Sequence, residues 1–224
     1  MRIEAGRLSA RLVGPEDAGA GFALRAASFR GGDPDRDRFD ALSRHLLIEG
    51  QGGLLGYARV CVSDGPDIAR GYTGAAYGLD AFAARFGPAV EVGRVCTAPL
   101  QADADVPRLM LAALARIAEA AGAGALFGCT SFPIDAAPLG RLVASVAPEA
   151  WAPAPRAAER VPLAGGRGPV PPLMRAWLAL GARVSDHGVV DRDLGTVHVF
   201  TALPVDAVPA ARVRRLAEGL IAAD

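Results

Sequence analysis

Two opposite charges stand close together in a segment that otherwise has the composition of a buried strand. Residues 91–97 read EVGRVCT, in which Glu91 and Arg94 interrupt a run of apolar residues. Charged side chains are rarely fully buried unless they are paired or take part in chemistry. A carboxylate can accept a proton, and a guanidinium can hold a second carboxylate through paired hydrogen bonds. These two residues are therefore the first candidates for a reactive site.

The spacing of the two charges sets a condition on the backbone. Residues three positions apart in a regular strand point to opposite faces, so Glu91 and Arg94 could not serve one site from an ideal pleat. A β-bulge adds a residue and re-aims the side chains beside it, and bulges gather near active sites. We therefore predict a β-bulge near Gly93.

Composition limits the classes of function. The chain has 224 residues, of which 51% are hydrophobic and 21% charged, as expected for an ordered globular protein. Its formal net charge is zero, which gives no indication of a nucleic-acid partner. All 24 basic residues are arginine, which excludes chemistry that depends on a lysine Schiff base or a phosphate-loop lysine. We expect a single domain over residues 1–224, with a Pro- and Gly-rich loop at about 148–172.

The cysteines and the apolar segments indicate a protein of a reducing compartment. Cys61, Cys96 and Cys129 lie far apart, a spacing that argues against a disulfide framework or a metal site. The N-terminus lacks the apolar core of a signal peptide. The most apolar stretch, 109–129, is broken by Arg116 and Glu119. We expect a cytoplasmic protein without a metal or bound cofactor, and contact with the inner membrane face stays an open alternative.

The pattern of apolar residues predicts alternating strands and helices. Strands are expected at 7–13, 45–50, 54–62, 89–97, 122–132 and 197–205. Helices are expected at 15–29, 79–86, 103–121, 134–147, 171–180 and 207–222. This order is typical of a layered α/β or α+β domain with a mixed sheet. Taken alone, it specifies no function.

Several polar residues stand in order along the chain, and together they form a recognisable pattern. Arg25 and Phe29 are followed by DRFD at 37–40, then by Arg59 and by EVGR at 91–94. This pattern resembles the acyl-homoserine lactone synthases and their relatives. HLLIEG at 45–50, RGYTGAAYGLD at 70–80, LFGCTSF at 126–132 and the segment 170–196 are similar to one branch, the ornithine–acyl-carrier-protein N-acyltransferases. The resemblance extends from about residue 8 to 204.

The resemblance implies a fold and a reaction. The fold is that of the Gcn5-related acetyltransferases: a mixed sheet with helices on both faces, whose two central parallel strands, here 89–97 and 125–131, splay apart. The reaction is the transfer of a 3-hydroxyacyl group from acyl carrier protein to the α-amine of L-ornithine. In this mechanism the amine attacks the thioester directly, and backbone N–H groups of the first splayed strand stabilise the oxyanion.

The resemblance also implies roles for individual residues. Glu91 and Arg94 are the expected catalytic residues, with Glu91 accepting a proton from the ornithine ammonium. Arg94 and Arg59 are suited to a substrate carboxylate, and Asp37 and Asp40 to its amines, although Asp40 could equally brace an arginine internally. The substrate-binding set expected on this basis is Arg25, Phe29, Asp37, Asp40, Arg59 and Ser131. His45 is expected to be a packed residue with a hydrogen bond.

The segment LQADADVPR at 100–108 bears on the acyl donor. Relatives that use coenzyme A carry a Gly-rich turn there, whose N–H groups bind the pyrophosphate. This sequence has no glycine in the segment and has Asp103 and Asp105 instead, which favours carrier protein as the donor. An acidic carrier would dock on arginines, and the candidates are Arg108, Arg116, Arg141, Arg156 and Arg160.

Two other interpretations stay open. One is an acyl-homoserine lactone synthase that uses S-adenosylmethionine, but such synthases usually carry a Trp where residues 30–36 here read RGGDPDR. The other is a non-catalytic acyl-binding module of the same fold. The acceptor identity, the acyl chain length and the oligomeric state are not determined by the sequence.

Overall fold

A computed structural model describes residues 1–98 and 105–208. By contact density the chain divides into two compact units, and each is described by itself. Within the described ranges, unit 1 comprises residues 1–62 and 92–120, and unit 2 comprises residues 63–91 and 121–208. Asp103 and most of the helix expected at 207–222 lie outside the described residues.

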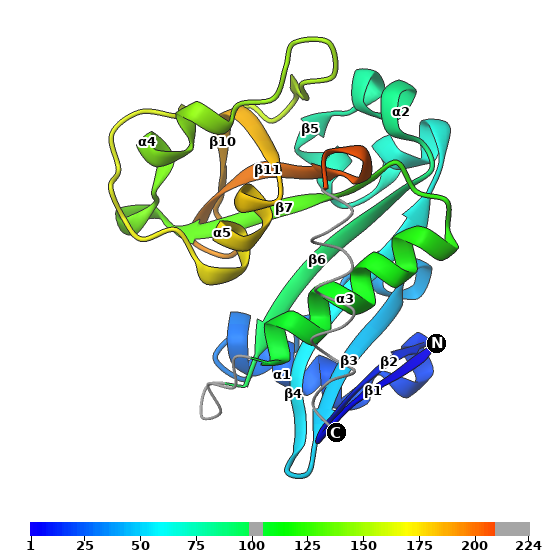
Figure 1. Ribbon diagram of the computed structural model, residues 1–224. Coiled ribbons are helices and arrows are strands. Elements are labelled where there is room, and N and C mark those ends of the chain that lie inside the picture. Colours follow the sequence, from blue (N-terminus) through cyan, green and yellow to red (C-terminus); the bar gives the residue numbers. More distant parts are fainter. Residues whose placement is uncertain (99–104, 209–224) are drawn as a thin grey trace. The chain divides into compact units, whose positions relative to one another are not determined.

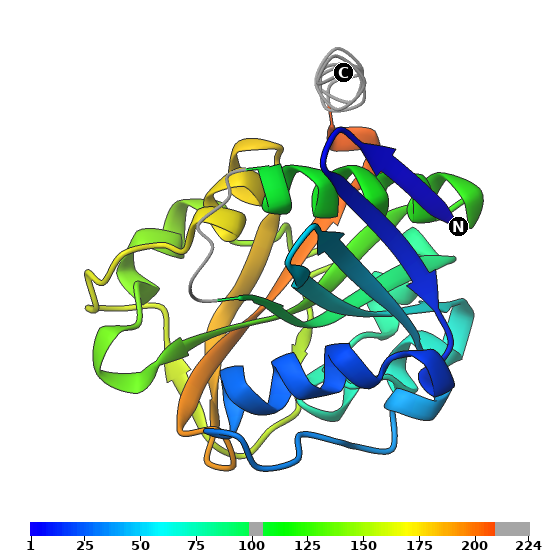
Figure 2. The same cartoon turned by 90° about the horizontal axis from the view of Figure 1, so that it is seen from below.

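Unit 1 is a sheet with one helix on each face (Figure 2). Its strands, in sheet order, are β1 (Arg2–Ala5), β2 (Leu8–Val13), β3 (Arg44–Gly50), β4 (Gly53–Ser63) and the larger part of β6 (Ala89–Thr97). The helices are α1 (Gly19–Phe29) and α3 (Asp105–Ala120). Neighbouring residues of β4 point to opposite faces: the Tyr57 ring lies against Gly21 of α1, and Gly56 faces Val106 and Met110 of α3.

Unit 2 includes the start of β6, up to Glu91 (Figure 1). Its strands, in sheet order after β6, are β7 (Ala125–Pro133), β11 (Thr196–Pro204), β10 (Arg183–Asp191) and β9 (Arg160–Pro162). Its helices are α2 (Asp80–Phe86), α4 (Leu139–Leu142) and α5 (Pro172–Ala179), and a separate ribbon pairs β5 (Tyr77–Gly78) with β8 (Ala154–Pro155). Aromatic residues, including Phe82, Phe127 and Phe200, fill one core, and aliphatic residues such as Val199 and Leu142 fill a second.

The parallel pairing of β6 with β7 is short. It comprises three residue pairs, from Ala89↔Ala125 to Glu91↔Phe127, although each strand is nine residues long. Every other strand pair with a described register is antiparallel. The predicted mixed sheet is thus confirmed, and the predicted central parallel strands pair over only a third of their length, as splayed strands require.

Some elements differ from the prediction. The helix expected at 134–147 is wrong: the segment forms the four-residue α4 between two short 3-10 turns, Ile134–Ala136 and Val143–Ser145. Pro138 stands in its middle, and proline interrupts a helix because it has no N–H to donate. The edge strands β1 and β9, the ribbon strands and β10 were not predicted. The boundary of a single domain over the whole chain stays a prediction.

Two earlier expectations concern cysteines and membranes. Cys61, Cys96 and Cys129 form no disulfide with one another, as their spacing predicted. Among the helices of residues 1–98 and 105–208, none combines the length and the apolar character needed to cross a bilayer.

Two glycines of α1 provide a matched test of this packing. A Cβ at Gly21 would lie 2.3 Å from the Tyr57 ring, whereas a Cβ at Gly19 meets nothing within 4 Å. Gly21→Ala should therefore lower the free energy of unfolding by about 1–3 kcal/mol, because the helix must move off the sheet. Gly19→Ala should leave it unchanged or raise it by up to about 1 kcal/mol, because alanine restricts the unfolded chain. Urea denaturation measures both, and equal effects would contradict the packing described.

Candidate functional site

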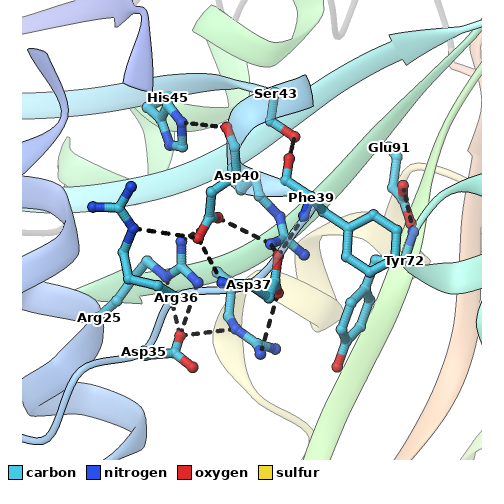
Figure 3. A network of polar contacts seen from close by, with 12 residues as sticks. Arg25, Asp35, Arg36, Asp37, Phe39, Asp40, Ser43, His45, Tyr72 and Glu91 are labelled. Atoms are coloured by element: carbon cyan, nitrogen blue, oxygen red, sulfur yellow. Dashed lines mark hydrogen bonds and ion pairs between the residues drawn. The ribbon is translucent and has the colours of Figure 1, made fainter. Parts of the chain in front are cut away.

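A fully buried guanidinium lies at the centre of a charged cluster in unit 1. Arg25 projects from α1 and has an exposed fraction of 0%. Its Nε donates to Oδ2 of Asp35 at 3.0 Å, and one terminal nitrogen donates to Oδ1 of Asp40 at 2.6 Å. The same nitrogen donates to the Tyr57 hydroxyl at 3.2 Å. Figure 3 shows Arg25 of the helix close to Asp35 and Asp40 of the loop after it.

Asp40 accepts hydrogen bonds from several elements. It begins a 3-10 turn (Asp40–Leu42) and is 1% exposed. Its Oδ1 accepts from Arg25 and, at 3.1 Å, from Arg59 of β4. Its Oδ2 accepts from the backbone N–H of Asp37 at 2.9 Å, which closes the loop on itself. A carboxylate with this many donors holds the 30–40 loop against the sheet, so the internal bracing role considered for Asp40 is the one the contacts support.

Arg94 joins the cluster from β6. Its Nε donates to Asp35 at 2.9 Å, a terminal nitrogen lies 3.8 Å from Asp37, and its guanidinium lies 5.7 Å from the centre of the Phe29 ring. The backbone of Arg94 has φ +53°, the left-handed region, which a regular strand does not contain. The regular strand conformation of β6 is therefore interrupted at Arg94, one residue after Gly93. The predicted bulge near Gly93 required an interruption at this place.

The cluster is nearly neutral as a whole and strongly polarised within. Three arginines (25, 59 and 94) face three aspartates (35, 37 and 40), and Arg30 and Arg36 lie at the rim. Burial alone would raise the pKa of Asp35 and Asp40, but the neighbouring arginines and hydrogen bonds hold the pKa of both below its ordinary value. Burial alone would lower the pKa of Arg25, yet Asp40 and Tyr57 hold it above its ordinary value.

His45 and Tyr57 extend the cluster beneath Arg25. His45 Nδ1 lies 2.7 Å from the Tyr57 hydroxyl, and Nε2 lies 3.2 Å from the carbonyl oxygen of Asp40. A carbonyl only accepts, so Nε2 carries the proton and Nδ1 accepts from the Tyr57 hydroxyl. Burial lowers the pKa of His45 and raises the pKa of Tyr57 to about 12. His45 is thus the packed, hydrogen-bonded residue that the sequence predicted.

Glu91 has a separate set of partners in unit 2. One carboxylate oxygen accepts from the backbone N–H of Thr73 at 2.6 Å, and the other accepts from that of Tyr72 at 3.2 Å (Figure 3). A Cβ at Gly71 would lie 2.3 Å from the carboxylate, so only glycine fits there without a shift. Glu91 therefore anchors the turn at 71–75, and these backbone partners are distinct from the aspartates that Arg94 contacts.

The remaining predicted site residues are also divided between the two units. Arg59 donates to both Asp37 and Asp40 in unit 1. Ser131 is an exposed residue of β7 in unit 2, directly opposite His198 of β11. The structure thus brings together six of the eight predicted site residues, while Glu91 and Ser131 lie in the other unit. The six are Arg25, Phe29, Asp37, Asp40, Arg59 and Arg94.

Burial distinguishes the roles within the cluster. Arg25 and Asp40 expose 0% and 1%, so they have no surface to offer a ligand and serve to position others. The side chains of Arg94 and Asp37 expose 9% and 24% and form the accessible edge. Asp35, buried beside both Arg25 and Arg94, was missed because the loop RGGDPDRDRFD carries four aspartates with no signal to rank them.

Four of the five proposed docking arginines have internal partners, namely Arg108, Arg116, Arg141 and Arg156. Arg156 donates to the carbonyl of Gly74 at 2.9 Å and is partly buried. Arg108 forms an exposed ion pair with Asp105 at the start of α3. The docking surface for a carrier protein therefore stays a prediction.

Comparison with known proteins agrees with this architecture. Residues 22–112 match the model of the acetyltransferase (GNAT) domain, and no curated protein matches the chain. The matched range contains the whole charged cluster. The chain thus contains a region, less than half of its length, that is similar to the GNAT acetyltransferase domain, and the predicted GNAT-like fold and N-acyltransferase enzyme are confirmed at this level.

Solved structures of this fold include enzymes that make acylated amines. FeeM, an N-acyl amino acid synthase from uncultured soil microbes, is 11% identical with a TM-score of 0.56, covering 90% of this chain and 93% of its own. BjaI, a coenzyme A-dependent acyl-homoserine lactone synthase, is 11% identical with a TM-score of 0.54, covering 93% and 87%. MesI, a second such synthase, is 15% identical with a TM-score of 0.51, covering 94% and 95%. At these identities the likeness establishes the fold.

Removing the central guanidinium tests the cluster. Arg25→Met leaves Asp35 and Asp40 buried with fewer donors, so the free energy of unfolding should fall by about 3–5 kcal/mol. Arg116→Met is the matched control, because its ion pair with Glu119 is exposed and should contribute little. Chemical denaturation of both variants measures the difference, and a loss below about 1 kcal/mol for Arg25→Met would show that the cluster does not stabilise the fold.

The pKa of His45 predicts a pH dependence. Burial lowers the pKa in the folded state below about 6.5, the unfolded value, so the neutral ring contributes stability above pH 6.5 that is lost as the pH falls below it. The difference in free energy of unfolding between wild type and His45→Gln should therefore be largest near pH 8 and narrow toward pH 5. His187 and His198 are present in both proteins and cancel. A difference that stays constant with pH would contradict the account.

Proposed function

We propose that the protein transfers a 3-hydroxyacyl group from acyl carrier protein to the α-amine of L-ornithine, giving a lyso-ornithine lipid. The acetyltransferase domain supports the reaction class. The observation that carries the acceptor assignment is the pair Arg94 and Asp37. A guanidinium and a carboxylate lie 3.8 Å apart at the accessible edge of an otherwise buried cluster.

This pair suits a zwitterionic amino acid with a second amine. Arg94 offers N–H donors to a carboxylate, and Asp37 offers an acceptor to an ammonium group. Beneath them, Asp35 holds Arg94, and Arg59 holds Asp37 at 2.6 Å. A residue whose partners are buried keeps its orientation before substrate arrives, which lowers the entropy cost of binding.

The proposed chemistry is direct acyl transfer. The neutral α-amine attacks the thioester carbonyl, a tetrahedral oxyanion forms, and its collapse releases the carrier thiol and leaves an amide. The α-ammonium must lose one proton before the attack, and Glu91 is the proposed acceptor; the second proton that the nitrogen loses on collapse goes to the departing sulfur. Its two carboxylate oxygens bind the N–H groups of Tyr72 and Thr73, which fixes its orientation. The donor brings its own pantetheine arm, so the proposal includes no further cofactor and no metal.

Carrier protein is the proposed donor. Asp105 begins α3 and pairs with Arg108, so a carboxylate stands where a pyrophosphate would need a free helix N-terminus. A product with one fatty chain partitions into lipid, which makes peripheral contact with the inner membrane face part of the proposal.

A donor and acceptor matrix tests the proposal. Purified full-length protein is incubated with 3-hydroxydecanoyl-carrier protein or 3-hydroxydecanoyl-coenzyme A, and with ornithine, lysine, glutamine or S-adenosylmethionine. Free thiol and acylated product are measured. We expect acyl-ornithine, formed at least about tenfold faster from carrier protein. A lactone formed from S-adenosylmethionine would identify a homoserine lactone synthase instead, and no product with any amine would identify an acyl-binding module.

Glu91→Gln separates the proton-accepting role from the anchoring role. Turnover should fall by about 10²–10⁴-fold, because general base catalysis is typically worth that factor. Gly71→Ala is the matched control, since its Cβ would displace the same carboxylate without removing its charge. It should lower turnover less than Glu91→Gln does. Unchanged turnover in Glu91→Gln, with thermal unfolding like wild type, would remove Glu91 from the mechanism.

A further inference from the structure

Strand β10 carries a large bulge in unit 2. Val184 pairs with Thr201 and Gly188 with Val199, so residues 185–187 of β10 lie opposite a single residue of β11. Ser185 stabilises this detour: its hydroxyl donates to the carbonyl of His187 at 2.6 Å and accepts from the N–H of Phe200 at 3.2 Å. Ser185 is fully buried, so the bulge is built into the core of the sheet. Bulges of this kind re-aim a side chain, and here that side chain is His187.

His187 is held on one side of its ring only. Its Nδ1 bonds to the carboxylate of Asp186 at 2.6 Å, and the ring lies 5.3 Å from the ring of Tyr77. The residue is 8% exposed. Within the described residues, its Nε2 is buried and has no hydrogen-bond partner. A buried nitrogen is unfavourable to leave unpaired, so Nε2 requires a hydrogen-bonding group from water or from a ligand.

The groups around Nε2 restrict the chemistry of that ligand. Tyr77 is fully buried, and burial raises its pKa, so it is neutral. Burial lowers the pKa of His198, whose ring centre lies 5.7 Å from that of Tyr77. Within the described residues, the charged partner of His187 is Asp186, which bonds to Nδ1 and whose own side chain is 71% exposed. A neutral, largely apolar ligand with a single polar group fits these surroundings better than an ion does.

A hydroxyl meets the requirement in either state of the ring. It donates to Nε2 of the neutral imidazole and accepts from Nε2–H of the protonated one, whereas an ammonium only donates and a carboxylate only accepts. Tyr77 also belongs to an aromatic core with Phe82, Phe127 and Phe200, so the surroundings of the His187 ring on the side of Tyr77 are apolar.

We infer that His187 Nε2 binds the hydroxyl group of a hydroxylated acyl chain, which makes His187 a specificity-determining residue. The inference rests on the proposed function, because the acyl chain belongs to the proposed donor. It adds the group that distinguishes a 3-hydroxyacyl donor from an unsubstituted one. Asp186 acts by orienting the ring, with Nδ1 facing the carboxylate and Nε2 facing the ligand.

Two substitutions separate the two nitrogens. His187→Gln carries an amide near the position of Nε2, and His187→Asn carries one near Nδ1 alone. The ratio of kcat/KM for 3-hydroxydecanoyl- over decanoyl-carrier protein is measured for wild type and both variants. We expect the ratio to fall about tenfold in His187→Asn and to be largely retained in His187→Gln. An equal ratio in all three proteins would overturn the inference.

A direct binding measurement keeps the inference separate from the activity. The Cε1–H signal of His187 in the full-length protein is followed by NMR during titration with 3-hydroxydecanoate and with decanoate. We expect a saturable shift with the hydroxylated acid that is absent or much smaller with decanoate. Identical responses, or none, would overturn the hydroxyl site even if acyl transfer occurs. If wild type transfers no acyl group to any amine, the proposed function fails, and the titration still decides the hydroxyl site.

Discussion

A guanidinium with no exposed surface requires anions beside it, and in this protein Asp35 and Asp40 supply them. An uncompensated buried charge costs several kcal/mol, so the helix that carries Arg25 and the loop that carries the two aspartates can only fold together. The same constraint fixes β4 through Arg59 and β6 through Arg94. The buried Arg25 thus determines where three other segments of unit 1, namely the loop, β4 and β6, meet. It lies beneath the residues that face outward.

This arrangement explains why two partly exposed side chains keep a fixed orientation. Arg94 has a left-handed backbone conformation that costs an arginine about 1–3 kcal/mol, and its ion pair with Asp35 offsets that cost. Asp37 is held both by Arg59 and by the N–H of Phe39 at 2.9 Å. The strained backbone of Arg94 and the buried charges therefore act together to hold a cation and an anion side by side. Unit 2 has its own polar groups, Glu91 on the turn at 71–75 and His187 in the bulge of β10.

The sequence predicted the regular elements and much of the cluster, and its failures have physical causes. The helix α3 was predictable because Val106, Leu109, Met110 and Ile117 recur at helical spacing, and all are buried. Asp35 was not, because four aspartates in one loop look alike until their partners are known. Strand β10 was missed because its bulge breaks the alternation that marks a strand, and RVSDHGVVD reads as a polar turn. The separation of Glu91 from Arg94 depends on partners distant in sequence, Thr73 for one and Asp35 for the other.

The most direct measurement of the central claim is the coupling between Arg25 and Asp40. Free energies of unfolding of Arg25→Met, Asp40→Leu and the double variant define a double-mutant cycle. If the buried pair organises unit 1, each single substitution leaves the partner's charge buried and unpaired. The double variant should then be less destabilised than the sum of the two single variants by at least about 1.5 kcal/mol. Additive effects, with a coupling energy near zero, would show that the two residues act independently and would contradict the account.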